Sequence, residues 1–233
     1  MADRNAPCRC GSGRKYRNCH FRRDKEQETL VAAAKHEAGH VIATLHYDIS
    51  IGEEGVFITD DGNGFTDSNK TEKWGDGCIF DLDPKIKLAH FVTCFIGPVV
   101  EFRHRNMTLE DIEQKHIHYW VADFAAAMGC EGSCRTSTAV MLSPTQFQAC
   151  GKLTLGCFAM LTHPEREIPT VFKVGGVDVR GELKEAMLVA DKMASVYAAE
   201  INEFADLLLA KRKVSKDECA EWARNFQRKT LPD

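Results

Sequence analysis

Five consecutive residues, His36-Glu37-Ala38-Gly39-His40, carry two imidazoles four positions apart with a carboxylate between them. Positions four apart on an α-helix lie on one face, so His36 and His40 can bind the same metal ion. Glu37 then stands beside the first ligand, where it can take a proton from a water molecule and pass it to a leaving amine. These three residues therefore predict the metal pair and the general base of a hydrolytic zinc site.

An exposed helix that bears two histidines without a metal is the alternative interpretation of this pattern. The flanking residues argue against it, since residues 32–34 are three alanines and residues 41–43 are Val-Ile-Ala. Such neighbours predict a buried helix, and two histidines without a ligand are costly in an apolar interior. We therefore expect a metal, and a catalytic zinc ion needs a third protein ligand.

His46 is one candidate for that third ligand, because His36, His40 and His46 have the spacing of the metzincin pattern HExxHxxGxxH. The glycine of that pattern lets the helix break so that the third histidine can turn back, and Ala43 replaces it here. We therefore expect the helix to continue. His46 would then lie about 9 Å further along the axis, at about 1.5 Å per residue.

A second candidate comes from a resemblance to the FtsH-type zinc peptidases. Residues 34–43, Ala-Lys-His-Glu-Ala-Gly-His-Val-Ile-Ala, resemble the active-site helix of that family. Gly64-Phe65-Thr66 and the strand before it resemble the β element of the family, and residues 96–101 resemble its Gly-x-x-x-Glu helix. Residues 121–128 resemble its Ser-Asp helix, and the resemblance as a whole covers roughly residues 29–225.

This resemblance implies a zinc site made of His36, His40 and Asp123, with Glu37 as the acid and base. Glu101 is then either a reserve ligand or a hydrogen-bond acceptor for a ligand histidine. The chain departs from the family in one respect, because it contains no G-x-x-x-x-G-K-[ST] loop for ATP. We therefore expect any peptidase activity to be independent of ATP.

A second cluster of metal-binding residue types lies near the N-terminus. Three thiolates and an imidazole form a closed, structural zinc set, and Cys8-x-Cys10 with Cys19-His20 supplies these groups. The first 22 residues are almost without apolar side chains, and so small a segment usually needs a metal or a disulfide to fold. A disordered tail with incidental cysteines is the alternative.

Residues 7–20, Pro-Cys-Arg-Cys-Gly-Ser-Gly-Arg-Lys-Tyr-Arg-Asn-Cys-His, resemble the SEC-C zinc module. The resemblance implies zinc on Cys8, Cys10, Cys19 and His20, and a role in docking a protein partner. Residues 1–25 hold eight Lys or Arg against two Asp or Glu, whereas the other 208 residues hold 22 against 32. Such a basic face suits an acidic protein surface or RNA phosphates, and we expect the protein partner rather than nucleic acid.

The pattern along the chain predicts a mainly α protein with a small β element. Apolar spacing predicts a long helix over residues 182–211, and Ser215 with Glu218 forms a capping box for the helix that follows. A strand over residues 56–59 precedes a turn at 60–64 and a return strand, and its edge is where we expect a substrate segment to add. The remaining predicted elements are helices over 29–47, 84–103, 109–128, 150–162 and 215–227 and loops over 67–83 and 165–181.

We therefore predict two parts: a zinc module at residues 1–22 and a zincin-like, FtsH-type helical peptidase domain at residues 23–233, with a polar link at residues 21–28. No apolar stretch resembles a signal peptide or a membrane span. A cytoplasmic protein is expected, and there Cys130, Cys134 and the other unassigned cysteines would be free thiols.

The predicted function is a zinc endopeptidase with one catalytic and one structural zinc ion, acting on unfolded or docked protein substrates. The alternative is a catalytically inactive zinc-binding scaffold that binds a partner through the SEC-C module. The presence of Glu37 argues against the scaffold, because a purely structural site has no use for that carboxylate. A third hypothesis, a transcription-linked peptidase of the ImmA/IrrE type, depends only on residues 203–208 and their distance from His40 disfavours it.

Overall fold

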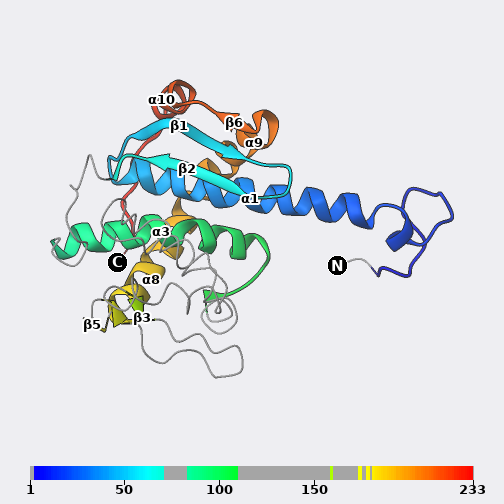
Figure 1. Ribbon diagram of the computed structural model, residues 1–233, viewed down its shortest axis with the longest axis horizontal. Helices are drawn as coiled ribbons and strands as arrows, with labels where there is room; N and C mark the ends of the chain where they lie inside the picture. The colour runs from blue at the N-terminus through cyan, green and yellow to red at the C-terminus, as the bar shows by residue number, and fades with distance from the viewer. Residues whose placement is uncertain are drawn as a thin grey trace.

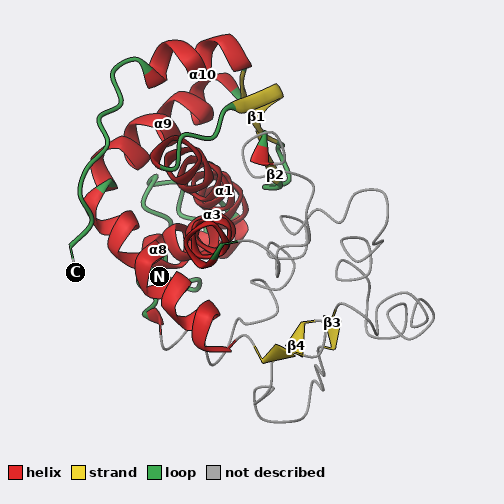
Figure 2. Cartoon of the chain, turned by 90° about the vertical axis from the view of Figure 1, so that its left-hand side faces the viewer, coloured by secondary structure: helices red, strands yellow, loops and turns green. Residues whose placement is uncertain are grey.

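The computed structural model of the 233-residue chain describes residues 3–70, 83–109, 158–159, 173–174, 177–178 and 180–232. Helix α1 (Phe21–His46) runs through the middle of the structure. On one side lie a small sheet, α9 (Ala198–Lys211) and α10 (Lys216–Ala223), and on the other lie α3 (Pro84–His104) and α8 (Arg180–Val196) (Figure 1; Figure 2). The described part of the chain is therefore mainly helical with a small β element, as predicted. None of its helices combines the length and apolar character needed to cross a membrane.

Helix α1 is longer than predicted, because it begins at Phe21 and includes the polar segment that we expected to be a link. This first part is largely exposed, and Arg22 pairs with Glu26 one turn later at 2.8 Å. Such pairs support an exposed helix without any apolar periodicity, which explains why the sequence pattern did not reveal it. From Leu30 onward the helix is buried, and small side chains such as Ala34 and Ala38 are fully covered.

Two glycines allow a close approach between α1 and α3. A Cβ atom added at Gly39 would lie 3.1 Å from the carbonyl oxygen of Ile96 and 3.3 Å from Cα of Gly97. These separations are shorter than ordinary van der Waals contact, so a larger residue at Gly39 would push the helices apart. The crossing is therefore set by backbone contact rather than by large side chains.

Helix α3 begins at Pro84, as predicted, and Asp83 caps it by accepting a hydrogen bond from the amide of Lys85 at 2.8 Å. Proline suits the first helical position because its missing N–H would have no helical partner there. The helix also contains Pro98. A proline inside a helix removes one hydrogen bond of the backbone ladder, so α3 lacks this bond at Pro98 although the helix continues to His104.

Strands β1 (Ile51–Ile58) and β2 (Gly64–Ser68) form the predicted antiparallel hairpin, with Val56 opposite Thr66. A third strand, β6 (Lys213–Val214), pairs with the other side of β1, so the order is β2-β1-β6. The expected free edge near residues 56–59 was therefore wrong, because a distant part of the chain adds a strand there. Among the described strands of this sheet, β2 has no neighbour on its outer edge.

The helical stretch predicted over residues 182–211 is divided at Tyr197 into α8 and α9. Hydrogen bonds continue across the division, since the amide of Tyr197 donates to Met193 and the amide of Ile201 donates to Tyr197, both at 2.9 Å. The apolar spacing therefore keeps its helical period, which is why the sequence shows one helix. The capping box of Ser215 and Glu218 at α10 is confirmed.

Short strands are the remaining difference from the predictions. β3 (Phe158–Ala159), within a predicted helix, pairs with β4 (Lys173–Val174), which pairs with β5 (Val177–Asp178). Two-residue strands depend on pairing with distant segments and have no periodicity that a sequence could show. Apart from Leu109, the predicted helix over residues 109–128 lies outside the described residues, as do Cys130 and Cys134.

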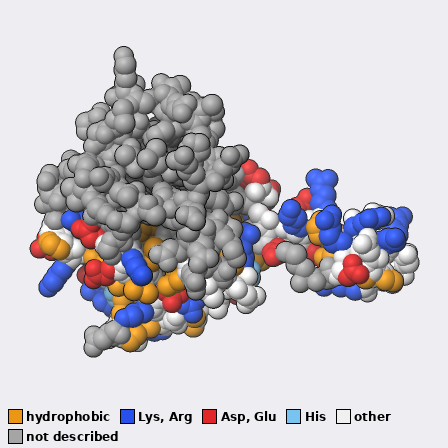
Figure 3. Space-filling model, turned by 90° about the horizontal axis from the view of Figure 1, so that it is seen from below, with side chains coloured by type: hydrophobic (Ala, Val, Ile, Leu, Met, Phe, Trp, Pro, Cys, Tyr) orange, Lys and Arg blue, Asp and Glu red, His pale blue; other side chains and the backbone are white. Residues whose placement is uncertain are grey.

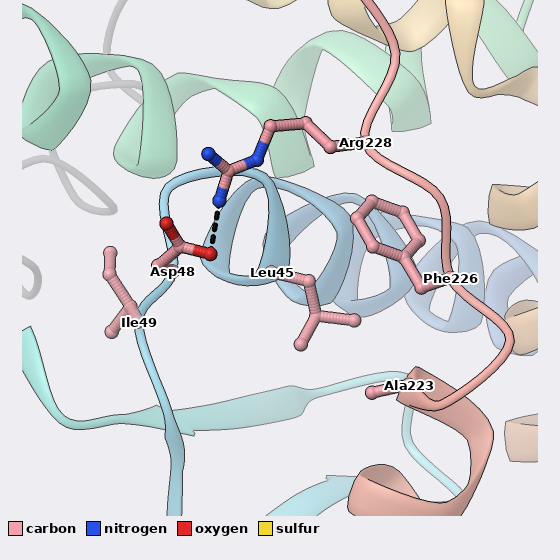
Figure 4. Close-up of a pocket in the computed structure, with 6 residues that line it drawn as sticks. All are labelled: Leu45, Asp48, Ile49, Ala223, Phe226 and Arg228. Atoms are coloured by element: carbon pink, nitrogen blue, oxygen red, sulfur yellow. Dashed lines mark ion pairs between the residues drawn. The ribbon is translucent and has the colours of Figure 1, made fainter.

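The segment after α10 returns along the C-terminal end of α1. Phe226 stacks on Tyr197 with ring centroids 5.3 Å apart, and Arg228 forms an ion pair with Asp48 (Figure 4). A cavity of about 600 Å³ lies beside this pair and is lined by Leu45, Asp48, Ile49, Ala223, Phe226 and Arg228 (Figure 4). These six residues include none of the predicted metal ligands, so the cavity is separate from the predicted chemistry.

Candidate metal centres

The four predicted ligands of the N-terminal module meet in one cluster. One ligand atom from each of Cys8, Cys10, Cys19 and His20 lies within 4.8 Å of all the others. His20 offers Nδ1, which is 3.1 Å from Cys8 Sγ and 3.2 Å from Cys19 Sγ. Tetrahedral zinc places its sulfur ligands about 3.8 Å apart, close to the 3.5 and 3.6 Å from Cys10 Sγ to those of Cys8 and Cys19. The cluster therefore has the dimensions of a closed zinc site.

Tight turns, rather than a core, bring these ligands together. The amide of Cys8 donates to the carbonyl of Arg14 at 2.7 Å, and Gly11 and Gly13 have φ angles of 73° and 70°. Glycine adopts this left-handed region without strain. Hydrogen bonds with Ser12 lower the pKa of the Cys10 thiol to about 6, so the thiolate that a metal requires forms readily near neutral pH.

His36 and His40 face each other one turn apart on α1, as their spacing predicts, and their Nε2 atoms are 3.1 Å apart. The other ring nitrogen of each contacts α3. Nδ1 of His36 lies 3.1 Å from Oε2 of Glu101, and Nδ1 of His40 lies 2.7 Å from the carbonyl oxygen of Thr93. The crossing of α1 and α3 therefore orients both rings.

These partners determine which nitrogen of each ring carries the proton. Carboxylate and carbonyl oxygens accept hydrogen bonds, so Nδ1 of His36 and of His40 is the donor, and in the neutral imidazole Nε2 then carries the lone pair that can bind a metal. Two such lone pairs at this separation are stabilised by a cation that both can bind, and tetrahedral zinc places two nitrogen ligands about 3.3 Å apart. Outer partners such as Glu101 are what orient histidine ligands in zinc sites. The pair therefore fits a zinc ion bound through Nε2.

Glu37 is only 5% exposed and lies against the hairpin. The hydroxyl of Thr66 donates to Oε2 of Glu37 at 2.7 Å, and a Cβ atom added at Gly64 would lie 2.5 Å from Oε1. Strand β2 therefore covers and orients the carboxylate. Gly64 and Thr66 belong to the segment that resembles the FtsH-type β element, but the sequence did not predict this contact with Glu37. Gly64 and Thr66 are two positions apart, and residues with this spacing on a strand share a face, so the sequence could have indicated that both face Glu37.

Gly97 is a further residue of the site; it belongs to the segment that resembles the Gly-x-x-x-Glu helix, but the resemblance gave it no role. A Cβ atom there would collide with Nε2 of His40 and would lie 2.7 Å from Nε2 of His36. The backbone of α3 therefore closes one side of the space between the two imidazoles. This close approach requires a glycine, and the Gly-x-x-x-Glu pattern that contains Gly97 and Glu101 was the available signal.

The structure also distinguishes the candidates for a third ligand. Helix α1 continues to His46, as predicted, and Nδ1 of His46 lies 2.8 Å from the hydroxyl of Tyr197 rather than at the histidine pair. Glu101 contacts the outer nitrogen of His36, which is the place of a hydrogen-bond acceptor rather than of a ligand. Asp123, the ligand that the resemblance implies, lies outside the described residues and stays a prediction.

Comparison with known proteins identifies the N-terminal module. The SEC-C motif matches residues 4–22, a segment that contains all four clustered ligands. No curated protein and no solved structure matches the chain. Residues 4–22 therefore form a SEC-C motif whose Cys and His ligand atoms are close enough together to bind one metal ion. The peptidase resemblance of the rest of the chain stays a prediction.

We expect Cys10→Ser to lower the zinc content from about two ions per chain to about one, because the closed site loses a thiolate. Elemental analysis of the purified protein measures this content. Cys219→Ser is the matched control and should keep both ions, since burial raises the pKa of the Cys219 thiol to about 11 and it lies outside the cluster. An unchanged zinc content in Cys10→Ser would contradict the assignment.

Gly97→Ala should remove the metal at His36 and His40 while the helices remain folded, because the new Cβ occupies the space beside both Nε2 atoms. Elemental analysis and circular dichroism measure the two effects. Gly39→Ala is the control at the same crossing, since its Cβ would meet α3 backbone and Val100 rather than the imidazoles. It should lower thermal stability by moving the helices apart, and it should weaken metal binding less than Gly97→Ala does. If both variants keep two zinc ions, the pair does not bind metal as assigned.

Proposed function

We propose that this protein is an ATP-independent zinc endopeptidase that hydrolyses peptide bonds in unfolded or docked protein substrates. The observation that carries the proposal is the pair of Nε2 atoms 3.1 Å apart, with both Nδ1 atoms held by α3. A buried carboxylate, Glu37, follows the first of these histidines. A structural site would need four ligands and no acid, so this arrangement favours catalysis.

The residues of the chain have distinct parts in the proposed reaction. His36 and His40, with Asp123 as the proposed third ligand, would hold zinc, which supplies Lewis-acid polarisation of the scissile carbonyl. Glu37 takes the proton of the attacking water and later gives it to the leaving amine. The hydroxyl of Thr66 keeps one carboxylate oxygen of Glu37 fixed, which reduces the number of orientations that the base can adopt.

The outer edge of β2 is the proposed place for the substrate backbone. Extended peptides bind by adding a strand to such an edge, and β2 is the strand whose Thr66 and Gly64 contact Glu37. A peptide bound there lies beside the proposed base. Only an unfolded or flexible segment can adopt this conformation, and the SEC-C module is proposed to dock a protein partner or the substrate itself.

Glu37→Gln should lower the rate of cleavage of casein or of a peptide library by about 10²–10⁴-fold, the usual contribution of a general acid and base. Fluorescence release from labelled casein, with the zinc-loaded protein, measures the rate. Glu28→Gln, an exposed carboxylate on the same helix, is the matched control and should leave the rate unchanged. If zinc is bound and wild type is as inert as Glu37→Gln, the protein is a zinc-binding scaffold and the peptidase proposal fails.

Asp123→Ala should weaken zinc binding at the His36–His40 site without affecting the SEC-C site, because it removes a proposed ligand. Chelator competition, followed by elemental analysis, measures the affinity of each site. Glu101→Ala removes the acceptor of His36 and the ion pair with Arg105 but no proposed ligand, and should cause the smaller loss, about 10- to 100-fold. The opposite ranking of the two variants would reverse the ligand assignment.

A further inference from the structure

One continuous helix connects the two candidate metal centres. The last ligand of the SEC-C cluster, His20, directly precedes Phe21, the first residue of α1, and Glu37 lies on the same helix. At about 1.5 Å per residue, the seventeen residues from His20 to Glu37 correspond to about 25 Å. The module therefore stands at a set distance from the proposed base, and Figure 1 shows it projecting beyond the helical body.

Side-chain contacts attach the module to the first turn of α1. Asp24 accepts hydrogen bonds from the Tyr16 hydroxyl and from Arg9, both at 2.8 Å. The rings of Tyr16 and Phe21 pack edge to face with centroids 5.9 Å apart, and the guanidinium of Arg4 lies 4.4 Å from the centroid of Phe21. These contacts oppose rotation of the module about the helix, so its orientation as well as its distance is maintained.

The module has a basic surface, visible in the projecting part of the molecule in Figure 3. Arg14, Lys15, Arg17 and Arg23 are exposed, and no ion pair within the described residues involves them. The remainder of the chain is acidic, since the 208 residues after residue 25 hold 32 Asp or Glu and 22 Lys or Arg. An acidic ligand would therefore be repelled by most of the chain and attracted to the module.

The direction of strand β2 decides which end of a bound peptide would lie near the module. The turn before β2 lies against the exposed part of α1, since a Cβ atom at Gly62 would collide with Thr29. Further along, Thr66 contacts Glu37, and Asn69 bonds to Ser50 beyond the end of α1. Strand β2 therefore runs in the direction of α1, away from the module. A peptide that pairs antiparallel with β2 would have its C-terminal side directed toward the module.

We infer that the basic face of the SEC-C module binds an acidic segment of the substrate, located about seven or eight extended residues C-terminal to the scissile bond. This spacing is the separation of about 25 Å divided by about 3.3 Å per extended residue. The inference rests on the proposed peptidase function and adds a substrate class to it. Binding at two points would raise affinity only when the spacing between them is right.

An acidic peptide fits this surface better than RNA. Proteins that bind single-stranded RNA without sequence preference usually stack bases on aromatic side chains. The aromatic residues of the module, Tyr16 and Phe21, are partly buried and packed against each other, against Asp24 and against Arg4. The exposed side chains of the module include Arg14, Lys15 and Arg17 but no aromatic ring, which suits a run of carboxylates better than stacked bases.

The test uses full-length, zinc-loaded Glu37→Gln protein, so that binding is measured without turnover. The probes are fluorescent peptides with a Val-Thr hexapeptide, a proline spacer and five glutamates, read by fluorescence anisotropy. Polyproline extends about 3.1 Å per residue. Half of the hexapeptide spans about 10 Å at about 3.3 Å per extended residue, and five prolines span about 15 Å. Together they cover the separation of about 25 Å between the proposed base and the module. We expect the five-proline peptide to bind at least tenfold more tightly than peptides with no proline or with thirteen.

Three matched comparisons accompany this measurement. Placing the glutamates before the hexapeptide should abolish the gain. Reversing the charge of the module with Arg14→Glu and Lys15→Glu should lower the affinity of every peptide to that of the hexapeptide without glutamates. Insertion of seven helix-forming residues between Gln27 and Glu28, an exposed part of α1, lengthens the helix by about 10 Å with the same face outward. It should move the best spacer from five prolines to about eight.

The inference is overturned if the glutamates add nothing, if the charge-reversed protein binds equally well, or if affinity does not depend on the spacer. Tighter binding of an oligouridine than of the acidic peptides would identify the module as an RNA-binding element instead. Circular dichroism and zinc content establish that the variants are folded. Failure of the peptidase proposal is seen separately, as absence of cleavage by wild type, and leaves these binding results intact.

Discussion

The close crossing of α1 and α3 is the contact on which the proposed active site depends. Gly39 and Gly97 let the two backbones approach to a distance that a Cβ atom would prevent. This approach brings Glu101 and the carbonyl of Thr93 within hydrogen-bond distance of His36 and His40. A histidine pair without such partners could rotate and present either nitrogen. The helix crossing is thus what turns two histidines into a preorganised pair.

The second constraint on the site comes from the sheet. The hairpin of β1 and β2 lies over Glu37 and contributes Thr66 as a hydrogen-bond donor. Within the part of the chain that the structure describes, β6 occupies the far side of β1 and leaves β2 as the edge strand next to the carboxylate. The same topology therefore supplies both the contact that orients the proposed base and the edge proposed for the substrate.

The continuity of α1 gives the SEC-C module its place in this arrangement. The polar residues 21–28 form exposed helix rather than a flexible link. The ion pair of Arg22 with Glu26 supports this exposed helix, and the contacts of Asp24 keep the module aligned with it. A flexible link of that length would let the module sample many positions and would lose the advantage of a defined spacing.

The sequence alone determined which chemical groups come together within one helix or one tight turn, because their spacing along the chain fixes their relative positions there. It was sufficient to predict the cluster of Cys8, Cys10, Cys19 and His20, the facing of His36 and His40, and the hairpin. Only the tertiary structure decided that β1 is central, that Gly97 borders the imidazoles, and that Thr66 orients Glu37. These features join segments far apart in the chain, and no local periodicity records which distant segments meet.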